Sequence, residues 1–258
     1  MSAFYLRDGD VFSSTASTRG PWDNRSQHAG PPSALLVRAA EAKGLELELP
    51  HLARFTAQIL RPVPIAPLSV ELGVDKRGRS AARLSAKLLH EDRVLIRATA
   101  LVLRTRAIEV KLSAKPFTGP TPEASEPFDF PFFRADVGYH TAIELRLGRG
   151  TFGQTPTFMW MRPRHPLVEG EPLSGAQRVA LCADSGNGVS PVLDWKTHGF
   201  INPDLTIAWH RTLRGQWIGL DAETTVEPDA GVGTAHSRIY DLEGPVAYGL
   251  QSLLCDPL

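Results

Sequence analysis

A stretch rich in proline and glycine near the middle of the chain constrains the fold most. It reads Pro116-Phe117-Thr118-Gly119-Pro120-Thr121-Pro122. Proline fixes φ and removes a backbone donor, so this stretch can hold neither a helix nor a central strand. The sequence therefore predicts a linker over 113–132, which divides the 258 residues into units 1–112 and 133–258, each of ordinary domain size.

Each unit is predicted to begin its regular structure with a helix. In the first unit, Pro31-Pro32 opens the run 33–43, and a glycine follows that run, as is typical of a helix. In the second unit, Ser174 is a candidate N-cap for a helix over 176–183. We expect Gly186-Asn187-Gly188 to end that second helix.

Strands follow the helix in both units, because apolar residues there alternate or run continuously. The predicted strands are 69–75, 83–88 and 94–103 in the first unit, and 218–226, 234–240 and 246–255 in the second. The segment 54–61 also aligns with 204–211, with a threonine and an arginine in register, which predicts a duplicated domain. A central helix against a bent antiparallel sheet, present twice, is the α+β double hotdog fold. An unrelated α+β protein is the alternative.

Composition and charge exclude several classes of protein. Lys+Arg and Asp+Glu both number 28, so there is no basic excess of the kind that nucleic-acid binders show. The basic run Lys76-Arg77-Gly78-Arg79 is interpreted as a hairpin turn. The chain has no apolar signal segment and no run of ~18 uncharged apolar residues, so we expect no membrane span and a cytoplasmic location. Cys182 and Cys255 are predicted to be buried free thiols.

The common catalytic and cofactor motifs are absent from the sequence. There is no G-x-S-x-G, no P-loop and no histidine or cysteine pair at metal-ligand spacing, so we expect no metal and no cofactor. The segment 148–153 fits G-x-G-x-x-G, but a turn and a strand-like segment follow it. Dinucleotide binding needs a helix at that place, so this match is interpreted as a turn.

Three polar residues lie where polar side chains are unexpected. Asp184 follows the second predicted helix, where a carboxylate faces the negative end of the helix dipole at a cost of ~0.3–1 kcal/mol. Asn202 precedes a proline at the start of a strand. Gln251 lies inside the apolar last strand, with Thr99 as its counterpart in the first unit. Turn chemistry explains the first two equally well, and a structural hydrogen bond explains the third.

The order and spacing of these segments resemble the acyl-CoA thioesterase II family of double hotdog enzymes, and more closely its actinobacterial-type thioesterase-like group. In the first unit, Gln27-His28-Ala29-Gly30 resembles the His-Gly-Gly start of the family's N-terminal helix, and Arg61-Pro62 also fits. The matching segments of the second unit are Ala183-Asp184-Ser185, Phe200-Ile201-Asn202-Pro203-Asp204-Leu205-Thr206, His210-Arg211, Trp217, Tyr240-Asp241 and Gln251-Ser252-Leu253.

The resemblance implies hydrolysis of acyl-CoA to free acid and CoA by direct attack of water. The family's trio of Asp, Thr or Ser, and Gln falls on Asp184, Asn202 and Gln251 as the catalytic residues. Asn202 departs from the hydroxyl residue of the family, and Ala29 departs from its second glycine. The substrate-binding residues that the resemblance implies are His28, Gly30, Trp209 and Arg211.

The same resemblance sets further expectations for substrate and partners. Backbone N–H groups near Gly30 are expected to face the oxyanion, and the acyl chain to lie between the two units, against Trp209 and the segment 158–160. A non-catalytic acyl-CoA or lipid-binding protein is the first alternative. An enoyl-CoA hydratase is the second, although the chain lacks the histidine expected for it. Exposed sheet edges favour a homodimer.

Overall fold

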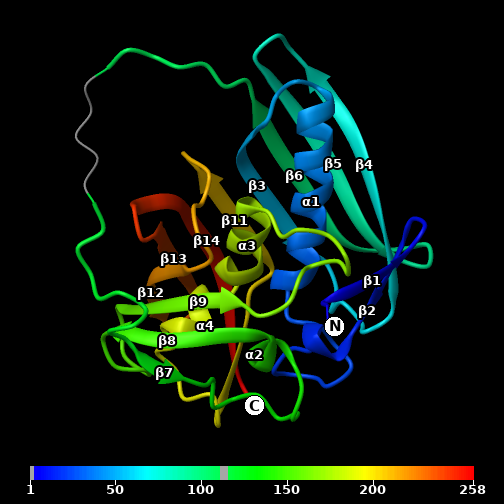
Figure 1. Cartoon of the computed structure of the whole chain (residues 1–258). Helices are drawn as coiled ribbons and strands as arrows, with labels where there is room; N and C mark the ends of the chain where they lie inside the picture. Colours follow the sequence, from blue (N-terminus) through cyan, green and yellow to red (C-terminus); the bar gives the residue numbers. More distant parts are fainter. Residues whose placement is uncertain (1–2, 111–115) are drawn as a thin grey trace.

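The computed structural model describes residues 3–110 and 116–258 (Figure 1). In this part of the chain the helices are η1 (Ala16–Thr18), α1 (Gly30–Glu46), α2 (Tyr139–Ala142), α3 (Gly175–Ala183) and α4 (Gly186–Val189). The strands are β1 (Tyr5–Asp8), β2 (Val11–Ser14), β3 (His51–Ile59), β4 (Pro67–Arg77), β5 (Ala81–His90), β6 (Arg93–Leu103), β7 (Glu126–Phe128), β8 (Ile143–Arg149), β9 (Thr157–Pro163), β10 (His198–Ile201), β11 (Asp204–Trp209), β12 (Ile218–Glu227), β13 (Val232–Asp241) and β14 (Gly244–Pro257).

All these strands belong to one antiparallel sheet that joins the two units. Its order is β1-β2-β4-β5-β6-β3-β11-β14-β13-β12-β9-β8-β7, with β10 beside β14. Helix α1 lies against β3 to β6, and α3 lies against β9, β12 and β13, as Figure 1 shows. The structure therefore confirms the α+β double hotdog fold, with one central helix for each half of the sheet.

The strand register at the junction of the two units shows the duplication directly. Strands β3 and β11 pair so that Thr56 lies opposite Thr206, and the Thr206 hydroxyl donates to the Thr56 hydroxyl at 3.1 Å. Arg54 then lies opposite Ala208, and Gln58 opposite Asp204. This reciprocal pattern is that of a two-fold axis passing between the two threonines, so it confirms the alignment of 54–61 with 204–211.

The start of α3 agrees with the sequence prediction, and the short helix α4 after it was not predicted. Ser174 is the N-cap of α3 and its hydroxyl accepts from Gln177 N–H at 3.1 Å, as expected. Helix α3 ends at Ala183 as expected, but Gly186-Asn187-Gly188 do not form the turn that ends it, because they belong to the single turn α4. Tertiary contacts hold that turn, since the N–H of Asn187 donates to Gln251 Oε1 at 3.2 Å and the hydroxyls of Ser190 and Thr224 share a hydrogen bond of 2.8 Å.

The predicted linker is shorter than expected on its C-terminal side. Residues 126–128 within it form strand β7, which pairs with β8. The expected boundary between 112 and 113 lies outside the described residues, so the division into units stays a prediction at that point. A further hairpin, β1–β2, extends the first unit beyond β4.

The sheet ends in short strands on both sides. Strand β1 has four residues and β7 has three. Short edge strands offer few free backbone groups to another chain. The expectation of a homodimer stays a prediction, and these edges lend it little support.

Several smaller predictions also have an outcome in the structure. Cys182 and Cys255 are buried free thiols, and the run 76–79 lies in the β4–β5 hairpin, both as expected. The segment 148–153 leads from β8 through a turn into β9, so it opens no helix. Across 3–110 and 116–258, the helices are too short or too polar to cross a membrane.

Candidate active site

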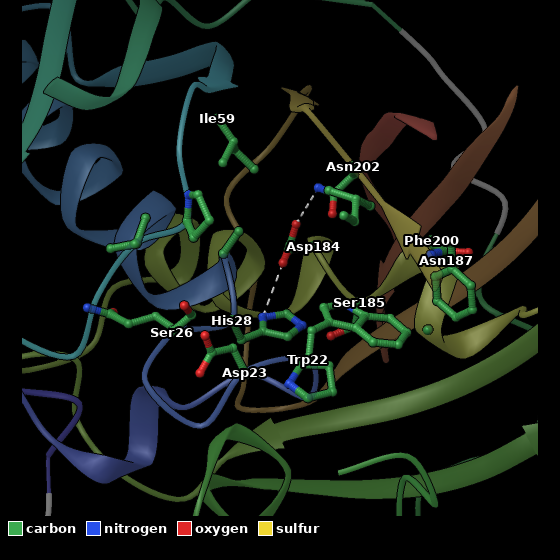
Figure 2. A pocket seen from close by; sticks show the side chains of 18 of the residues that line it. Trp22, Asp23, Ser26, His28, Ile59, Asp184, Ser185, Asn187, Phe200 and Asn202 are labelled. Atoms are coloured by element: carbon green, nitrogen blue, oxygen red, sulfur yellow. Dashed lines mark hydrogen bonds and ion pairs between the residues drawn. The ribbon is translucent and has the colours of Figure 1, made fainter. Parts of the chain in front are cut away.

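A cavity of about 430 Å³ lies between the two units (Figure 2). Its volume is in the range that small-molecule sites occupy. The first unit contributes residues from 20–29 and 59–63, and the second contributes residues from 130–133, 184–188 and 200–203. Neither unit alone encloses this space.

Asp184 is the centre of the polar end of the cavity. It is the C-cap of α3 and is only 7% exposed. Its Oδ1 accepts from Asn202 Nδ2 at 2.8 Å and from Gln251 Nε2 at 3.3 Å. Its Oδ2 lies 3.1 Å from His28 Nδ1, as the dashed lines of Figure 2 show in part. The structure thus brings together all three predicted catalytic residues and one predicted substrate-binding residue.

Asn202 lies in the short break between strands β10 and β11. Strands β10 and β11 both pair with β14, and Asn202-Pro203 separates them. Proline has no N–H, so the ladder cannot continue through it. Asn202 Nδ2 also donates to the backbone carbonyl of Asp204 at 3.1 Å. Within the described residues its Oδ1 has no hydrogen-bond partner, and Asn202 lines the cavity.

Gln251 lies behind Asp184 and not at the cavity surface. It is 2% exposed, and its Nε2 donates to the Asp184 backbone carbonyl at 2.9 Å as well as to the carboxylate. Its Oε1 accepts from Asn187 N–H at 3.2 Å. All of its amide groups are therefore engaged in holding α3 and α4 on strand β14. This geometry favours a positioning role for Gln251, and its catalytic role stays a prediction.

The counterpart of Gln251 in the first unit is Ala100 and not Thr99. Thr56 pairs with Thr99, and its equivalent Thr206 pairs with Leu250, so Thr99 matches Leu250. The predicted match was one residue out of register, which on a strand exchanges the two faces of the sheet.

The corresponding positions of the first unit are apolar. Asn202 aligns with Leu52, just as Thr206 aligns with Thr56, and Gln251 aligns with Ala100. Leu52 and Ala100 are both buried in the core. Within 3–110 and 116–258, the polar site is therefore present in the second unit and not in the first.

The His28 ring is held by stacking on Tyr139, whose hydroxyl is fixed by Leu181 and Ser185. Its ring lies parallel to that of Tyr139, with 3.8 Å between centroids and 1° between planes. The Tyr139 hydroxyl donates to the Leu181 carbonyl at 2.8 Å and shares a hydrogen bond with the Ser185 hydroxyl at 3.0 Å. Burial lowers the pKa of His28, which the negative charge of Asp184 only partly offsets. The ring is therefore neutral near pH 7.

The proton on the neutral His28 ring can lie on either ring nitrogen. Nδ1 lies 3.1 Å from Gly30 N and 3.1 Å from Asp184 Oδ2. It can accept from the first or donate to the second. A proton on Nδ1 makes His28 a donor to Asp184 and leaves the Gly30 N–H facing another N–H, whereas a proton on Nε2 lets Nδ1 accept from Gly30.

Gly30 allows helices α1 and α3 to pack closely where they cross. A Cβ built there would lie 2.3 Å from the Leu181 carbonyl of α3. The next two residues, Pro31 and Pro32, have no N–H, and the N–H of Gly30 points at His28. Gly30 does not line the cavity. The expectation that backbone N–H groups near Gly30 face an oxyanion stays a prediction, since the preceding residue, Ala29, lines the cavity.

Arg211 and Trp209 lie away from the cavity. Trp209 is the last residue of β11 and lies roughly 20 Å from Asn202, at ~3.3 Å per residue, and Arg211 follows just beyond the strand. Arg211 makes two hydrogen bonds of 2.6 Å to the buried carboxylate of Asp241, and Trp209 is buried in the core. Their predicted contact with substrate is not supported by these positions, because they stabilise the end of the sheet.

The ion pair between Arg211 and Asp241 should make the stability of the fold depend on pH. Burial raises its pKa, but hydrogen bonds from Arg211 and from two backbone N–H groups outweigh that effect and lower the pKa overall. A lowered pKa contributes stability that is present above the unfolded value of about 3.9 and is lost as the pH falls through the folded value. We expect Asp241→Asn to be less stable than wild type at pH 7, with the difference shrinking below about pH 4. Urea unfolding at a series of pH values measures this, and parallel curves would contradict it.

Gln251→Leu is expected to destabilise the fold. It leaves the Asn187 N–H and the Asp184 carbonyl unpaired in a buried place, at about 1–3 kcal/mol each. The matched control is Gln58→Leu on the exposed face of β3, which should change the free energy of unfolding by less than ~0.5 kcal/mol. Urea unfolding compares the two, and equal effects would show that the buried hydrogen bonds contribute nothing.

The residues 158–160, predicted to contact the acyl chain, also lie away from the cavity. Those residues are buried in the core and do not line the cavity. The aromatic residues that do line it are Trp22, Phe130, Phe132, Phe133 and Phe200. The cluster Phe130-Pro131-Phe132-Phe133 was a signal in the sequence, because a solvated linker rarely carries three phenylalanines.

Other chemistries find little support at this place. Across 3–110 and 116–258, no three His, Cys, Asp or Glu side chains are grouped to hold a metal ion. Burial raises the pKa of the Cys182 thiol far above its usual range, so this neighbour of the site stays protonated and is a poor nucleophile.

The fold and the site define a double hotdog protein with one carboxylate-centred cavity between its units. Two family models match the sequence, the acyl-CoA thioesterase N-terminal domain over 18–103 and the acyl-CoA thioesterase C-terminal domain over 118–255. The chain belongs to the acyl-CoA thioesterase family. No curated protein sequence matches it.

Solved structures share the fold at low sequence identity. A hotdog-fold protein of Alicyclobacillus acidocaldarius superposes with a TM-score of 0.76 at 16% identity, over 97% of this chain and 94% of that one. The tesB protein of Mycobacterium avium subspecies paratuberculosis gives 0.70 at 16% identity, over 97% and 95%. The acyl-CoA thioesterase II TesB2 of Mycobacterium marinum gives 0.67 at 13% identity, over 97% and 94%.

Proposed function

We propose that this protein hydrolyses acyl-CoA thioesters to free acid and CoA by direct attack of water. The observation that carries the proposal is the carboxylate of Asp184 at the cavity wall, held by Asn202, Gln251 and His28. Family membership supports the substrate class. A cavity formed by both units also suits a ligand with a long acyl and pantetheine axis.

Asp184 can hold one water molecule in addition to its present partners. An ionised carboxylate offers about four lone-pair sites. Two are used by Asn202 Nδ2 and Gln251 Nε2, and His28 uses a third when its ring proton is on Nδ1. The fourth accepts one water hydrogen, and the free Oδ1 of Asn202 accepts the other. With both hydrogens engaged, a lone pair of the water oxygen is left to face the thioester carbonyl.

The reaction then needs no covalent enzyme intermediate. Asp184 takes a proton as the water oxygen bonds to the carbonyl carbon, and the C–O π electrons move to oxygen. When the tetrahedral intermediate collapses, the C–S bond breaks and its electron pair leaves with sulfur. The proton on Asp184 passes to the CoA thiolate, and the free acid and thiol are released.

Thiol release from acyl-CoAs of different chain length tests the reaction. We expect turnover of at least one member of the panel. Single-turnover hydrolysis in ¹⁸O-labelled water, with enzyme in excess, should place solvent oxygen in the acid. Unlabelled acid would instead indicate attack by the carboxylate itself. Tight acyl-CoA binding without thiol release from any ester would favour the non-catalytic binding protein.

A further inference from the structure

Five aromatic side chains gather at one part of the cavity wall. Phe130 and Phe132 lie 5.0 Å apart between ring centroids, and Phe132 and Phe133 lie 5.5 Å apart. Phe132 also lies 6.4 Å from Trp22, and Trp22 lies 5.1 Å from Phe200. These residues form one continuous aromatic wall, to which both units contribute.

The aromatic wall has flat faces in a defined orientation. The Trp22 and Phe132 rings are parallel within 8°, and Phe200 meets Trp22 edge-on at 87°. Such rings present π faces and positive edges that a flat ring can match in stacked and edge-to-face contacts. A flexible alkyl chain gains apolar contact there, but it gains nothing from the orientation of the rings and loses more internal freedom.

The aromatic wall lies beside the reacting group. Phe200 is two residues from Asn202, and Figure 2 shows Trp22 and Phe200 on one side of Asp184, with Ile59 on the other. The pantetheine arm of CoA separates its adenine from the thioester by the full length of the arm. Rings this close to Asp184 therefore meet the acyl group and not the nucleotide.

We infer that the preferred substrates are aryl-substituted acyl thioesters, in which a planar ring lies close to the thioester carbonyl. This inference rests on the proposed function, which it deepens by naming the acyl class. Phe130, Phe132 and Phe133 all come from the segment between β7 and α2. The segment that joins the two units thus selects the acyl group.

Phenylacetyl-CoA and octanoyl-CoA, which carry acyl groups of equal carbon number, make the test pair. We expect kcat/KM to be about 2- to 13-fold higher for phenylacetyl-CoA, the range that favourable ring pairing provides. Phe132→Leu should lower this preference ratio toward one. Phe117→Leu is the matched control, because Phe117 contacts Phe158 and Trp160 outside the cavity, so the ratio should stay as in wild type.

Two results would overturn the inference. One is an equal or higher kcat/KM for octanoyl-CoA in wild type. The other is a Phe132→Leu effect that is equal for both CoA esters and disappears with the corresponding pantetheine esters, which would place the aromatic wall at the adenine. Dissociation constants of both esters, measured by calorimetry on Asp184→Asn, give the same preference ratio without turnover. Loss of the proposed hydrolysis and loss of the aryl preference are therefore separate outcomes.

Discussion

Replacing Asp184 by asparagine should lower kcat for thioester hydrolysis at least ~10²-fold, because the amide cannot accept the proton of the attacking water. KM should change much less, since the substitution preserves the size of the side chain. The measurement is steady-state thiol release with the best substrate of the panel. This is the largest effect on activity that we expect from a single substitution.

The control for this experiment is Asp221→Asn. Asp221 lies on strand β12, away from the cavity, and forms an ion pair with Arg149 of β8. Its replacement should therefore leave kcat within about twofold of wild type. Thermal unfolding of both variants separates lost chemistry from lost structure. Full activity in Asp184→Asn would assign the base to another residue and remove the main support for the proposed mechanism.

Gly30→Ala should produce the largest loss of stability. In an ordinary helix this exchange stabilises by roughly 0.5–1 kcal/mol, so even the sign of the effect is informative. Here the new methyl would lie 2.3 Å from the Leu181 carbonyl, and the contact is with backbone, which cannot rotate away. We expect a loss of about 3 kcal/mol or more in the free energy of unfolding, at the upper end for overpacked sites.

Gly188→Ala is the matched control for stability, since a methyl there meets only the edge of the Phe132 ring at 3.4 Å. Urea unfolding should show a change of less than ~1 kcal/mol for this variant. A stable Gly30→Ala protein that has lost only activity would reverse our interpretation. It would mean that Gly30 is needed for substrate binding or turnover and not for the close packing of α1 on α3.

The main elements were predictable because their patterns are strong and local. The helix N-cap at Ser174 and the alternation along β4, β5 and β12 follow from propensity and burial within a few residues. The alignment of Thr56 with Thr206 also predicted the duplication, which the pairing of β3 with β11 then showed. Local patterns therefore sufficed for the fold.

The errors arose where a long-range contact decides the outcome. Thr99 and Ala100 are neighbours on one strand, and only the pairing of β3, β6, β11 and β14 tells which of them faces the core. The turn α4 exists because Gln251 accepts from Asn187 far along the sequence. Arg211 was assigned to substrate from the resemblance alone, and its ion pair with Asp241, 30 residues away in the sequence, was not foreseen.

The pairing of β3 with β11 has a consequence for how the two units stay together. Hydrogen bonds, a shared sheet and the α1–α3 contact hold them across the two-fold axis, independently of the segment that connects them. The two units are thus arranged like the subunits of a symmetric dimer, joined in one polypeptide. Cleavage within the exposed residues 104–110 should leave two fragments that remain associated and elute together under native conditions.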